Sequence, residues 1–419
     1  MNGTVTKTCR LSWRNTLAAF KHRNYRLFFA GQGVSLIGTW MQNVAQGWLV
    51  YDLTRSAFLL GFVTFISALP ITVLTLLAGV AADRHNKRAI LIANQTAAML
   101  LAFLLAALVH WRVVTIWHIA GIGLLSGIAT AFDMPARQSF VVEMVGKEDL
   151  LNAIAMNSSM FHAARICGPA LAGLLIASIG EAGCFTLNGL SFLAVIAGYA
   201  AMRLPAHVPA VTEQSFRHAT AEAVRYVWGD RRTRVIIAVL AMMSVFGTSH
   251  MVLMPVFARE VLHTGAVGLG YLMAANGLGA LLGALTLASL GEHRQQRRLF
   301  FNGLLGFCLL VVAFAWSRWF WLSTVLMVGV GYCMIIAFAT ANTSVQMRTP
   351  DYLRGRVMGI FLLAFIGLNP FGALLAGALA RATNVSIATT IGEVICLGTV
   401  VVSMRLVPAE NLRIKSEDD

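Results

Sequence analysis

The stretch that decides the fold is Gly79-Val-Ala-Ala-Asp83-Arg84-His85-Asn86-Lys87-Arg88. It follows a long apolar run over residues 58–82 and precedes another over residues 89–109. A dense group of charges between two hydrophobic runs predicts a tight aqueous loop that joins two membrane helices. The basic side chains hold such a loop on the cytoplasmic side, while Asp83 can pair with a cation or with a helix N-terminus. Gly79 allows another helix to approach close to these charges.

The composition places the whole chain in a membrane. Of its 419 residues, 58% are hydrophobic and 12% are charged, whereas a soluble domain averages about 25% charged residues. Apolar runs of about 20 residues indicate transmembrane helices and not β-strands. The net charge of +14 is spread over short loops, unlike the single basic face of a nucleic-acid-binding protein. We therefore expect an all-α membrane protein that lies in the lipid bilayer and binds no nucleic acid.

Twelve spans are expected from the apolar runs, at residues 27–51, 58–82, 89–109, 115–138, 154–179, 183–202, 235–257, 267–291, 299–317, 319–341, 357–380 and 385–404. The first run is too long for a cleaved signal peptide. With the N-terminus inside, 26 Lys and Arg residues fall on the cytoplasmic side and 5 outside, as the positive-inside rule requires. Both termini are therefore expected in the cytoplasm.

An internal repeat divides the spans into two sets of six. Gly61…Gly79-x3-Asp83-x4-Arg88 returns as Gly270…Ala288-x3-Glu292-x4-Arg297, and Leu171-Ala172-Gly173 matches Leu375-Ala376-Gly377. The halves therefore have parallel orientation, related by an axis along the membrane normal. The expected segments are a cytoplasmic N-terminus (1–26), a first six-helix bundle (27–203), a cytoplasmic linker (204–234), a second six-helix bundle (235–404) and a cytoplasmic tail (405–419).

The linker contains one helical pattern. Apolar residues recur at helical spacing over residues 216–228, and Ser215 stands where a helix would be capped. This pattern predicts an amphipathic helix at the cytoplasmic surface. Either it simply tethers the two bundles, or it takes part in gating.

The charged loop after the second span resembles the signature loop of the major facilitator superfamily. Three further motifs, Gly38 to Thr54, Phe132 to Gln138 and Pro350 to Gly359, together resemble its transmembrane secretion effector branch, over residues 15–405. That branch includes enterobactin-type siderophore exporters and macrolide efflux proteins. The resemblance implies twelve helices in two pseudo-symmetric bundles, and an exporter in the bacterial inner membrane. It also implies a cavity lined by the first, fourth, seventh and tenth helices.

Ionisable residues inside the spans are the candidates for proton coupling, because a charge in lipid is costly and suggests a function. Asp133 either forms an i,i+4 ion pair with Arg137 or binds and releases protons in the cavity. Arg165 either pairs with Asp133 or anchors an anionic substrate. Glu393 lies in the twelfth span, which is peripheral in the resembled family, so a paired or snorkelling role is favoured there.

The predicted gate combines the signature loop with its repeat. In relatives an acid at the position of Glu143 pairs with the loop's base, so we expect a Glu143–Lys87–Asp83 cluster that locks the cytoplasmic gate of the outward-open state. The Gly168-Pro169 step resembles the antiporter signature of the fifth helix, where small residues permit close packing. The gate residues are Gly79, Asp83, Arg84, Lys87, Arg88, Glu143, Gly168, Pro169, Glu292 and Arg297.

A polar stripe in the first span predicts a cavity wall. Its residues recur at spacings of three or four, which places most of them on one helix face. Together with residues of later spans they form a mixed polar and aromatic lining, which suits a small amphiphilic organic molecule. The cavity candidates are Gln32, Ser35, Thr39, Gln42, Asn43, Gln46, Phe132, Asn276, Asn342 and Asn369.

Catalysis is not expected. The chain has no phosphate-binding loop of the Gly-x4-Gly-Lys-Ser/Thr kind, no nucleophile–base pair and no cysteine or histidine spacing typical of a metal site. We therefore expect no cofactor, and a monomer driven by protons that exports a small molecule. Two alternatives stay open: an uptake symporter of the same fold, or a non-transporting membrane receptor or lipid-handling protein.

Overall fold

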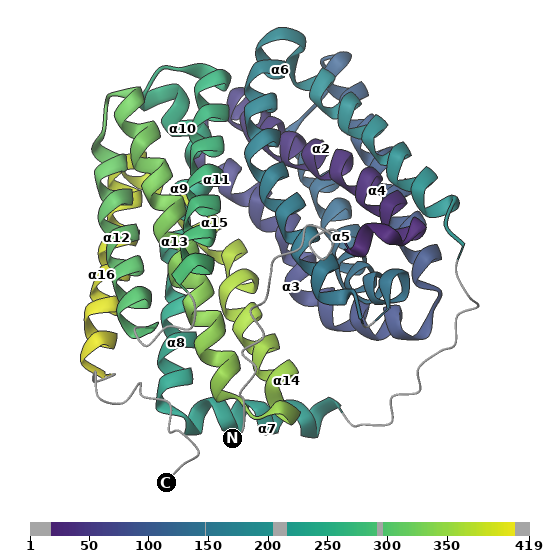
Figure 1. Ribbon diagram of the computed structural model, residues 1–419. Helices are drawn as coiled ribbons and strands as arrows, with labels where there is room; N and C mark the ends of the chain where they lie inside the picture. Colours follow the sequence, from purple (N-terminus) through teal and green to yellow (C-terminus); the bar gives the residue numbers. More distant parts are fainter. Residues whose placement is uncertain (1–17, 147, 204–215, 291–295, 407–419) are drawn as a thin grey trace, which may run out of the picture.

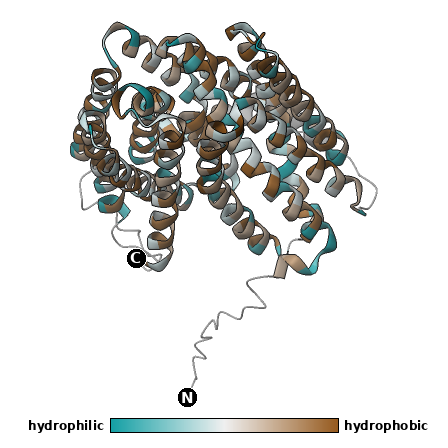
Figure 2. Cartoon of the chain, turned by 90° about the horizontal axis from the view of Figure 1, so that it is seen from above, coloured by the Kyte–Doolittle hydropathy of each residue, from teal (hydrophilic) through white to brown (hydrophobic). Residues whose placement is uncertain are grey.

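The computed structural model describes residues 18–146, 148–203, 216–290 and 296–406. Throughout these ranges the regular structure is helical. The helices form two groups that lie side by side, α2 to α6 and α8 to α16, as Figure 1 shows. Figure 2, which shows the chain from above, shows apolar residues along most of the helices, and many large apolar side chains are exposed. This is the distribution that a lipid environment favours.

The first group contains five helices joined by short turns: α2 (Arg23–Thr54), α3 (Ala57–Arg84), α4 (Lys87–His110), α5 (Ile116–Val145) and α6 (Leu150–Ala200), preceded by the short η1 (Ala18–Lys21). Some of the turns carry side-chain N-caps. Ser56 accepts from the amide of Leu59, and Asn86 accepts from the amide of Ala89. These caps satisfy amides that have no partner inside the helix. Turns this short make successive helices antiparallel neighbours.

Helix α6 is two spans in one continuous segment. Its 51 residues would extend about 76 Å if straight, far beyond a hydrocarbon core of about 30 Å. Gly180 breaks it, with φ 73° and ψ 177°, a conformation that glycine adopts without steric penalty. The predicted spans 154–179 and 183–202 lie on either side of this break.

The second group contains interrupted helices. One span consists of α8 (Arg231–Met242), η2 (Met243–Gly247), α9 (Ser249–Val252), α10 (Met254–Val256) and η3 (Phe257–Val261). Another consists of α14 (Asp351–Leu362), η4 (Leu363–Gly367) and α15 (Asn369–Ala382), and the uninterrupted helices are α11 (Gly265–Leu290), α12 (Gln296–Trp316), α13 (Phe320–Arg348) and α16 (Val385–Leu406). The segments η2, η3 and η4 are π-helical, a feature frequent at functional sites.

Ten helical segments of the described chain are long and apolar enough to cross a membrane. This set counts α6 once and omits α2, a 32-residue helix interrupted by polar side chains. Dividing α6 at Gly180 and adding α2 leads to the predicted number of twelve spans, which stays a prediction. The architecture is that of an all-α membrane protein with two helix bundles.

Helix α7 (Phe216–Gly229) confirms the amphipathic helix predicted for the linker. Ala223 and Val227 are buried while Trp228 is exposed. The Tyr226 hydroxyl donates to the carbonyl of Arg348, at 2.7 Å, so α7 packs against the second group and lies across its end (Figure 1). Below, this end of the molecule is the α7 end, and the opposite end, where η3 lies, is the Glu260 end.

Candidate functional site

Two pairs of glycines bring the helix groups into backbone contact. A Cβ atom added to Gly61 of α3 would lie 3.2 Å from the Cα of Gly377 of α15. A Cβ atom added to Gly270 of α11 would lie 3.0 Å from the Cα of Gly173 of α6. These four glycines are the repeated positions of the sequence, so the repeat produces two equivalent helix crossings.

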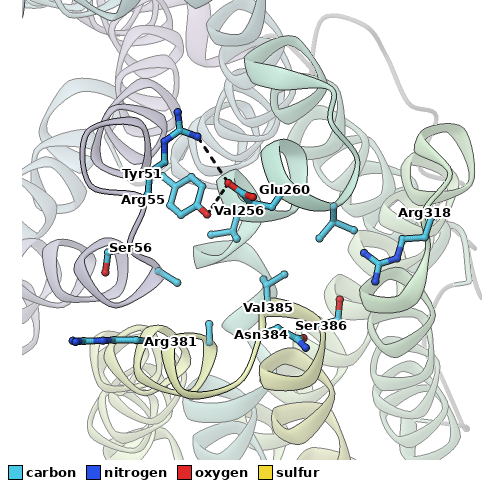
Figure 3. Close-up of a pocket in the computed structure, with 13 residues that line it drawn as sticks. Tyr51, Arg55, Ser56, Val256, Glu260, Arg318, Arg381, Asn384, Val385 and Ser386 are labelled. Carbon is cyan, nitrogen blue, oxygen red and sulfur yellow. Dashed lines mark hydrogen bonds and ion pairs between the residues drawn. The ribbon is translucent and has the colours of Figure 1, made fainter.

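Charged residues close the Glu260 end between the same two groups. Arg259 of η3 forms an ion pair with Asp52 of α2, and its guanidinium lies 5.1 Å from the ring of Trp48. The hydroxyl of Tyr51 donates to Glu260, at 3.2 Å, and Arg55 lies 3.9 Å from the same carboxylate (Figure 3). A surface pocket of about 860 Å³ lies beside these residues and is lined by both groups.

Arg165 and Asn276 meet across the central crossing of α6 and α11. The Arg165 guanidinium donates from Nη2 to Oδ1 of Asn276, at 2.7 Å. Asn276 is only 1% exposed, and its Nδ2 has no hydrogen-bond partner among the described residues. Thus the structure brings together a predicted coupling residue and a predicted cavity residue, and Arg165 does not contact Asp133.

Asp133 lies inside the first group. Its carboxylate accepts from Gln95 of α4, at 3.0 Å, and lies 3.1 Å from the guanidinium of Arg137. The carboxyl is 7% exposed. The i,i+4 pair that the sequence offered as one alternative is therefore formed, on a side of α5 that packs against its own bundle.

The surroundings of Glu393 differ from those expected from the sequence. It is 0% exposed, and neither carboxyl oxygen has a hydrogen-bond partner in the described part of the chain. It is thus not snorkelling, because α16 turns it inward and not toward the membrane interface, and the thiol of Cys308 on α12 faces its carboxyl. The buried residues nearby in sequence include Cys396 and Thr389, and the hydroxyl of Thr389 also has no partner.

The polar stripe of α2 serves more than one purpose. Gln42 accepts from the amide of Asn188 on α6, at 2.7 Å, so it joins two helices of one bundle. The Thr39 hydroxyl donates to the backbone carbonyl of Ser35, one turn earlier on the same helix, whereas Asn43 is exposed. Gln32 and Ser35 are buried, and Gln46 is half-buried. Only part of the stripe is therefore open as a cavity wall.

The other predicted cavity residues are distributed over the two bundles. Phe132 is half-buried on α5. Asn369 donates to the hydroxyl of Thr248, at 2.9 Å, and so joins α15 to the residue that precedes α9. Asn342 accepts from Gln346 one turn along α13, at 3.0 Å.

The gate residues form ion pairs and helix caps at the α7 end. Lys87 lies 2.5 Å from Glu143, as predicted, but both residues belong to the first bundle. Arg88 donates to the carbonyl of Ala200, at 2.6 Å, and Arg297 donates to that of Met404, at 2.9 Å. Since residues 88 and 297 are repeat equivalents, each bundle ends on the same arginine cap. The side chains of the remaining acidic and basic gate residues, Asp83, Arg84 and Glu292, lie outside the described residues.

Two glycine predictions have opposite outcomes. Among the described residues, an added Cβ at Gly79 would meet nothing within 4 Å, so the expected close helix approach is not made at that position in this conformation. At Gly168 an added Cβ would lie 2.5 Å from the Cβ of Trp40, which confirms tight packing. Pro169 follows, and its carbonyl lies against Gly270.

Several residues of the site were not predicted from the sequence. Gln95 and Asn188 are single amides in apolar spans, which was the only signal for them. Asp52, Arg259 and Glu260 looked like ordinary charges at span ends. Within the described ranges no group of His, Cys, Asp or Glu residues has metal-binding geometry.

Two helix bundles that meet at crossed glycines around a central polar contact are the architecture of the major facilitator fold. The family model of the transmembrane secretion effectors matches residues 14–418. The chain belongs to this family.

Curated relatives cover most of the chain. The multidrug efflux pump Tap of Mycolicibacterium fortuitum is 27% identical to this chain, in an alignment that covers 85% of this chain and 87% of the Tap chain. The staphyloferrin A transporter of Staphylococcus aureus is 25% identical over 84% and 88%. The enterobactin exporter EntS of Shigella boydii is 26% identical over 91% of each chain.

Solved structures share the fold at low identity. A bacterial homologue of the iron transporter ferroportin, in an inward-facing state, has a TM-score of 0.72 at 14% identity, covering 92% of this chain and 98% of that one. The nucleoside transporter NupG has a TM-score of 0.70 at 14% identity, with the same coverage. These structures show the fold, and the family and its curated relatives assign the chain to transport.

Proposed function

We propose that this protein exports a small amphiphilic organic molecule, of siderophore or drug type, by proton-coupled alternating access. The observation that carries the proposal is the position of the contacts between the bundles. The glycine crossings and the ion pairs of Asp52 and Glu260 lie toward the Glu260 end. If the basic α7 end is cytoplasmic, as the charge distribution predicts, this conformation is closed to the exterior. It would then accept cargo from the cytoplasm.

The relatives support the direction of transport, because Tap is named as an efflux pump and EntS as an exporter. A proton gradient supplies enough energy. A potential of about 100 mV contributes about 2.3 kcal/mol per charge, and one pH unit adds about 1.4 kcal/mol. Since about 1.4 kcal/mol is a factor of ten, one proton supports a gradient of several hundred-fold in an uncharged cargo. Asp133 and Glu393 are the buried carboxyls proposed to carry it.

Inside-out membrane vesicles test the coupling. Acidification of the vesicle interior should drive uptake of staphyloferrin A, and the protonophore-sensitive part should fall at least tenfold in Asp133→Asn or in Glu393→Gln. Asp351→Asn is the matched control, because that carboxylate is 89% exposed at the end of α14. If both buried variants kept full proton-driven uptake, the coupling assignment would be wrong. Uptake only into right-side-out vesicles would identify a symporter.

The proposed setting is a monomer in the bacterial inner membrane with both termini in the cytoplasm. Protease tags at the two termini test the orientation: they should be cleaved in inside-out vesicles and protected in intact spheroplasts. Cross-linking in the membrane tests the monomer, which should yield no dimer band. A tag cleaved from outside intact spheroplasts would invert the assignment of the α7 end.

A further inference from the structure

Arg165 lies in the middle of the membrane fold without a negative partner. Within the described residues, its hydrogen bond to a side chain is made to the neutral Asn276, and no carboxylate forms an ion pair with it. An unneutralised charge at this depth is costly and is retained where it has a function. Its position between α6 and α11 means that both bundles contribute to the same polar contact.

The surrounding groups supply donors without matching acceptors. A guanidinium only donates hydrogen bonds, so the atom of Asn276 that faces it is the oxygen, which leaves the amide Nδ2 directed elsewhere. That Nδ2 is buried and has no acceptor among the described residues. His162, one turn before Arg165 on α6, has a buried Nδ1 that also lacks a described partner. This nitrogen donates or accepts according to the tautomer, so the donors counted here are the guanidinium and the Asn276 amide. A ligand that fits here must bring acceptor oxygens.

Aromatic side chains lie next to this group of donors. Phe161 is four residues before Arg165, so it shares a helix face with it, and it is 43% exposed. Its ring meets the ring of Trp40 edge to face, with centroids 5.7 Å apart. An aromatic wall beside a guanidinium is suited to a molecule that has both an apolar ring and an anionic group.

We infer that Arg165 binds an anionic oxygen group of the cargo, such as a carboxylate, and that this exporter therefore carries amphiphilic organic anions. The inference rests on the proposed function and names its substrate class. The anion accepts from the Arg165 guanidinium, which also donates to the oxygen of Asn276 in the other bundle. Because Arg165 and Asn276 belong to different bundles, the anion binds at a contact between the two bundles. Arg165 is a binding residue in this account and not a proton carrier.

The first experiment needs no cargo. A cysteine at Phe161 in the purified full-length protein is reacted with an anionic and with a cationic methanethiosulfonate, and modification at position 161 is followed by peptide mass spectrometry. Relative to a small free thiol, we expect the anionic reagent to be favoured about tenfold, since a charge a few ångströms away contributes on the order of 1 kcal/mol or more. Adding Arg165→Gln should abolish the preference, and Arg165→Lys should retain it. An unchanged preference in Arg165→Gln would overturn the inference.

The second experiment compares two xanthene dyes in inside-out vesicles, the anionic fluorescein and the cationic rhodamine 6G. Arg165→Gln should lower fluorescein uptake at least tenfold and leave rhodamine 6G uptake unchanged or raised. An equal loss for both dyes would indicate a structural role and would overturn the inference. Failure of the wild-type protein to move either dye would count against the proposed export, and the charge preference at position 161 would still decide the role of Arg165.

Discussion

Gly61 of α3 and Gly377 of α15 lie in backbone contact across the two bundles, at a distance that leaves no room for any side chain. The same relationship joins Gly270 of α11 to Gly173 of α6. Small residues at a crossing let two helices approach closely in lipid, where packing and not water expulsion drives association. The two crossings are therefore the points about which alternating access would have to separate or slide the bundles.

Enlarging a crossing glycine should open the Glu260 end. We expect Gly61→Leu to destabilise the present conformation by about 1–3 kcal/mol, the usual cost of overpacking. A cysteine at Val256, which is buried beside the surface pocket, should then react about tenfold faster with an impermeant maleimide added from outside. Gly398→Leu is the control, because an added Cβ there meets nothing within 4 Å. Equal labelling in the two variants would show that the crossing does not govern opening.

The Asp52–Arg259 pair should contribute a smaller bias toward the same conformation. Its side chains are 43% and 25% exposed, so we expect no more than about 1 kcal/mol. Asp52→Asn should raise the rate at which the maleimide labels a cysteine at position 256 by at most about fivefold. The exchange Asp52→Arg with Arg259→Asp should restore the wild-type rate if charge attraction is the cause. Continued fast labelling in the exchanged protein would instead assign the effect to the contact of Arg259 with Trp48.

The cluster of Lys21, His22 and Asp149 at the α7 end should make stability depend on pH. Asp149 lies 2.6 Å from Lys21 and 2.7 Å from His22. Hydrogen bonds from these two residues lower the pKa of Asp149 below 3.8, and the bond to Asp149 raises the pKa of Lys21 above 10.5.

A carboxyl whose pKa is lower in the folded protein stabilises the fold at pH values above its pKa in the unfolded chain. This contribution is lost as the pH falls through the folded-state pKa. A lysine whose pKa is higher in the folded protein stabilises the fold at pH values below its pKa in the unfolded chain. This contribution is lost as the pH rises through the folded-state pKa. Asp149→Asn should therefore lower the melting temperature by a constant amount between about pH 5 and 9. The difference should shrink below about pH 4 and above about pH 10.5. A difference that stays constant into acid would contradict this account.

Removing the buried carboxyl of Glu393 should stabilise the protein. A buried polar group without a partner costs about 1–3 kcal/mol, and neither oxygen of Glu393 has a described partner. We expect Glu393→Leu to raise the melting temperature, as measured by thermal unfolding in detergent. Thr389→Val is the matched comparison, since that buried hydroxyl is also unpaired, and it should have a smaller effect of the same sign. A lower melting temperature for Glu393→Leu would indicate that the carboxyl has a stabilising partner.

Much of the fold was readable from the chain because it depends on local order. Apolar runs and the charged loop after Ala82 define helices and turns by spacing alone. The repeat of Gly61 as Gly270 predicted two equivalent halves before any contact was known. The amphipathic pattern of residues 216–228 likewise became α7.

The partners of the buried polar residues were decided by the tertiary structure. The sequence favoured pairing of Arg165 with Asp133 over an anionic substrate, and only the packing of α6 on α11 directed it to Asn276. Glu393 turned inward, and Gly79 was left without a neighbour. Spacing along the chain determines which residues share a helix face. Which faces of two helices meet depends on how each helix is rotated and how closely it approaches its neighbours. These are set by many contacts over the whole bundle, which sequence order alone does not specify.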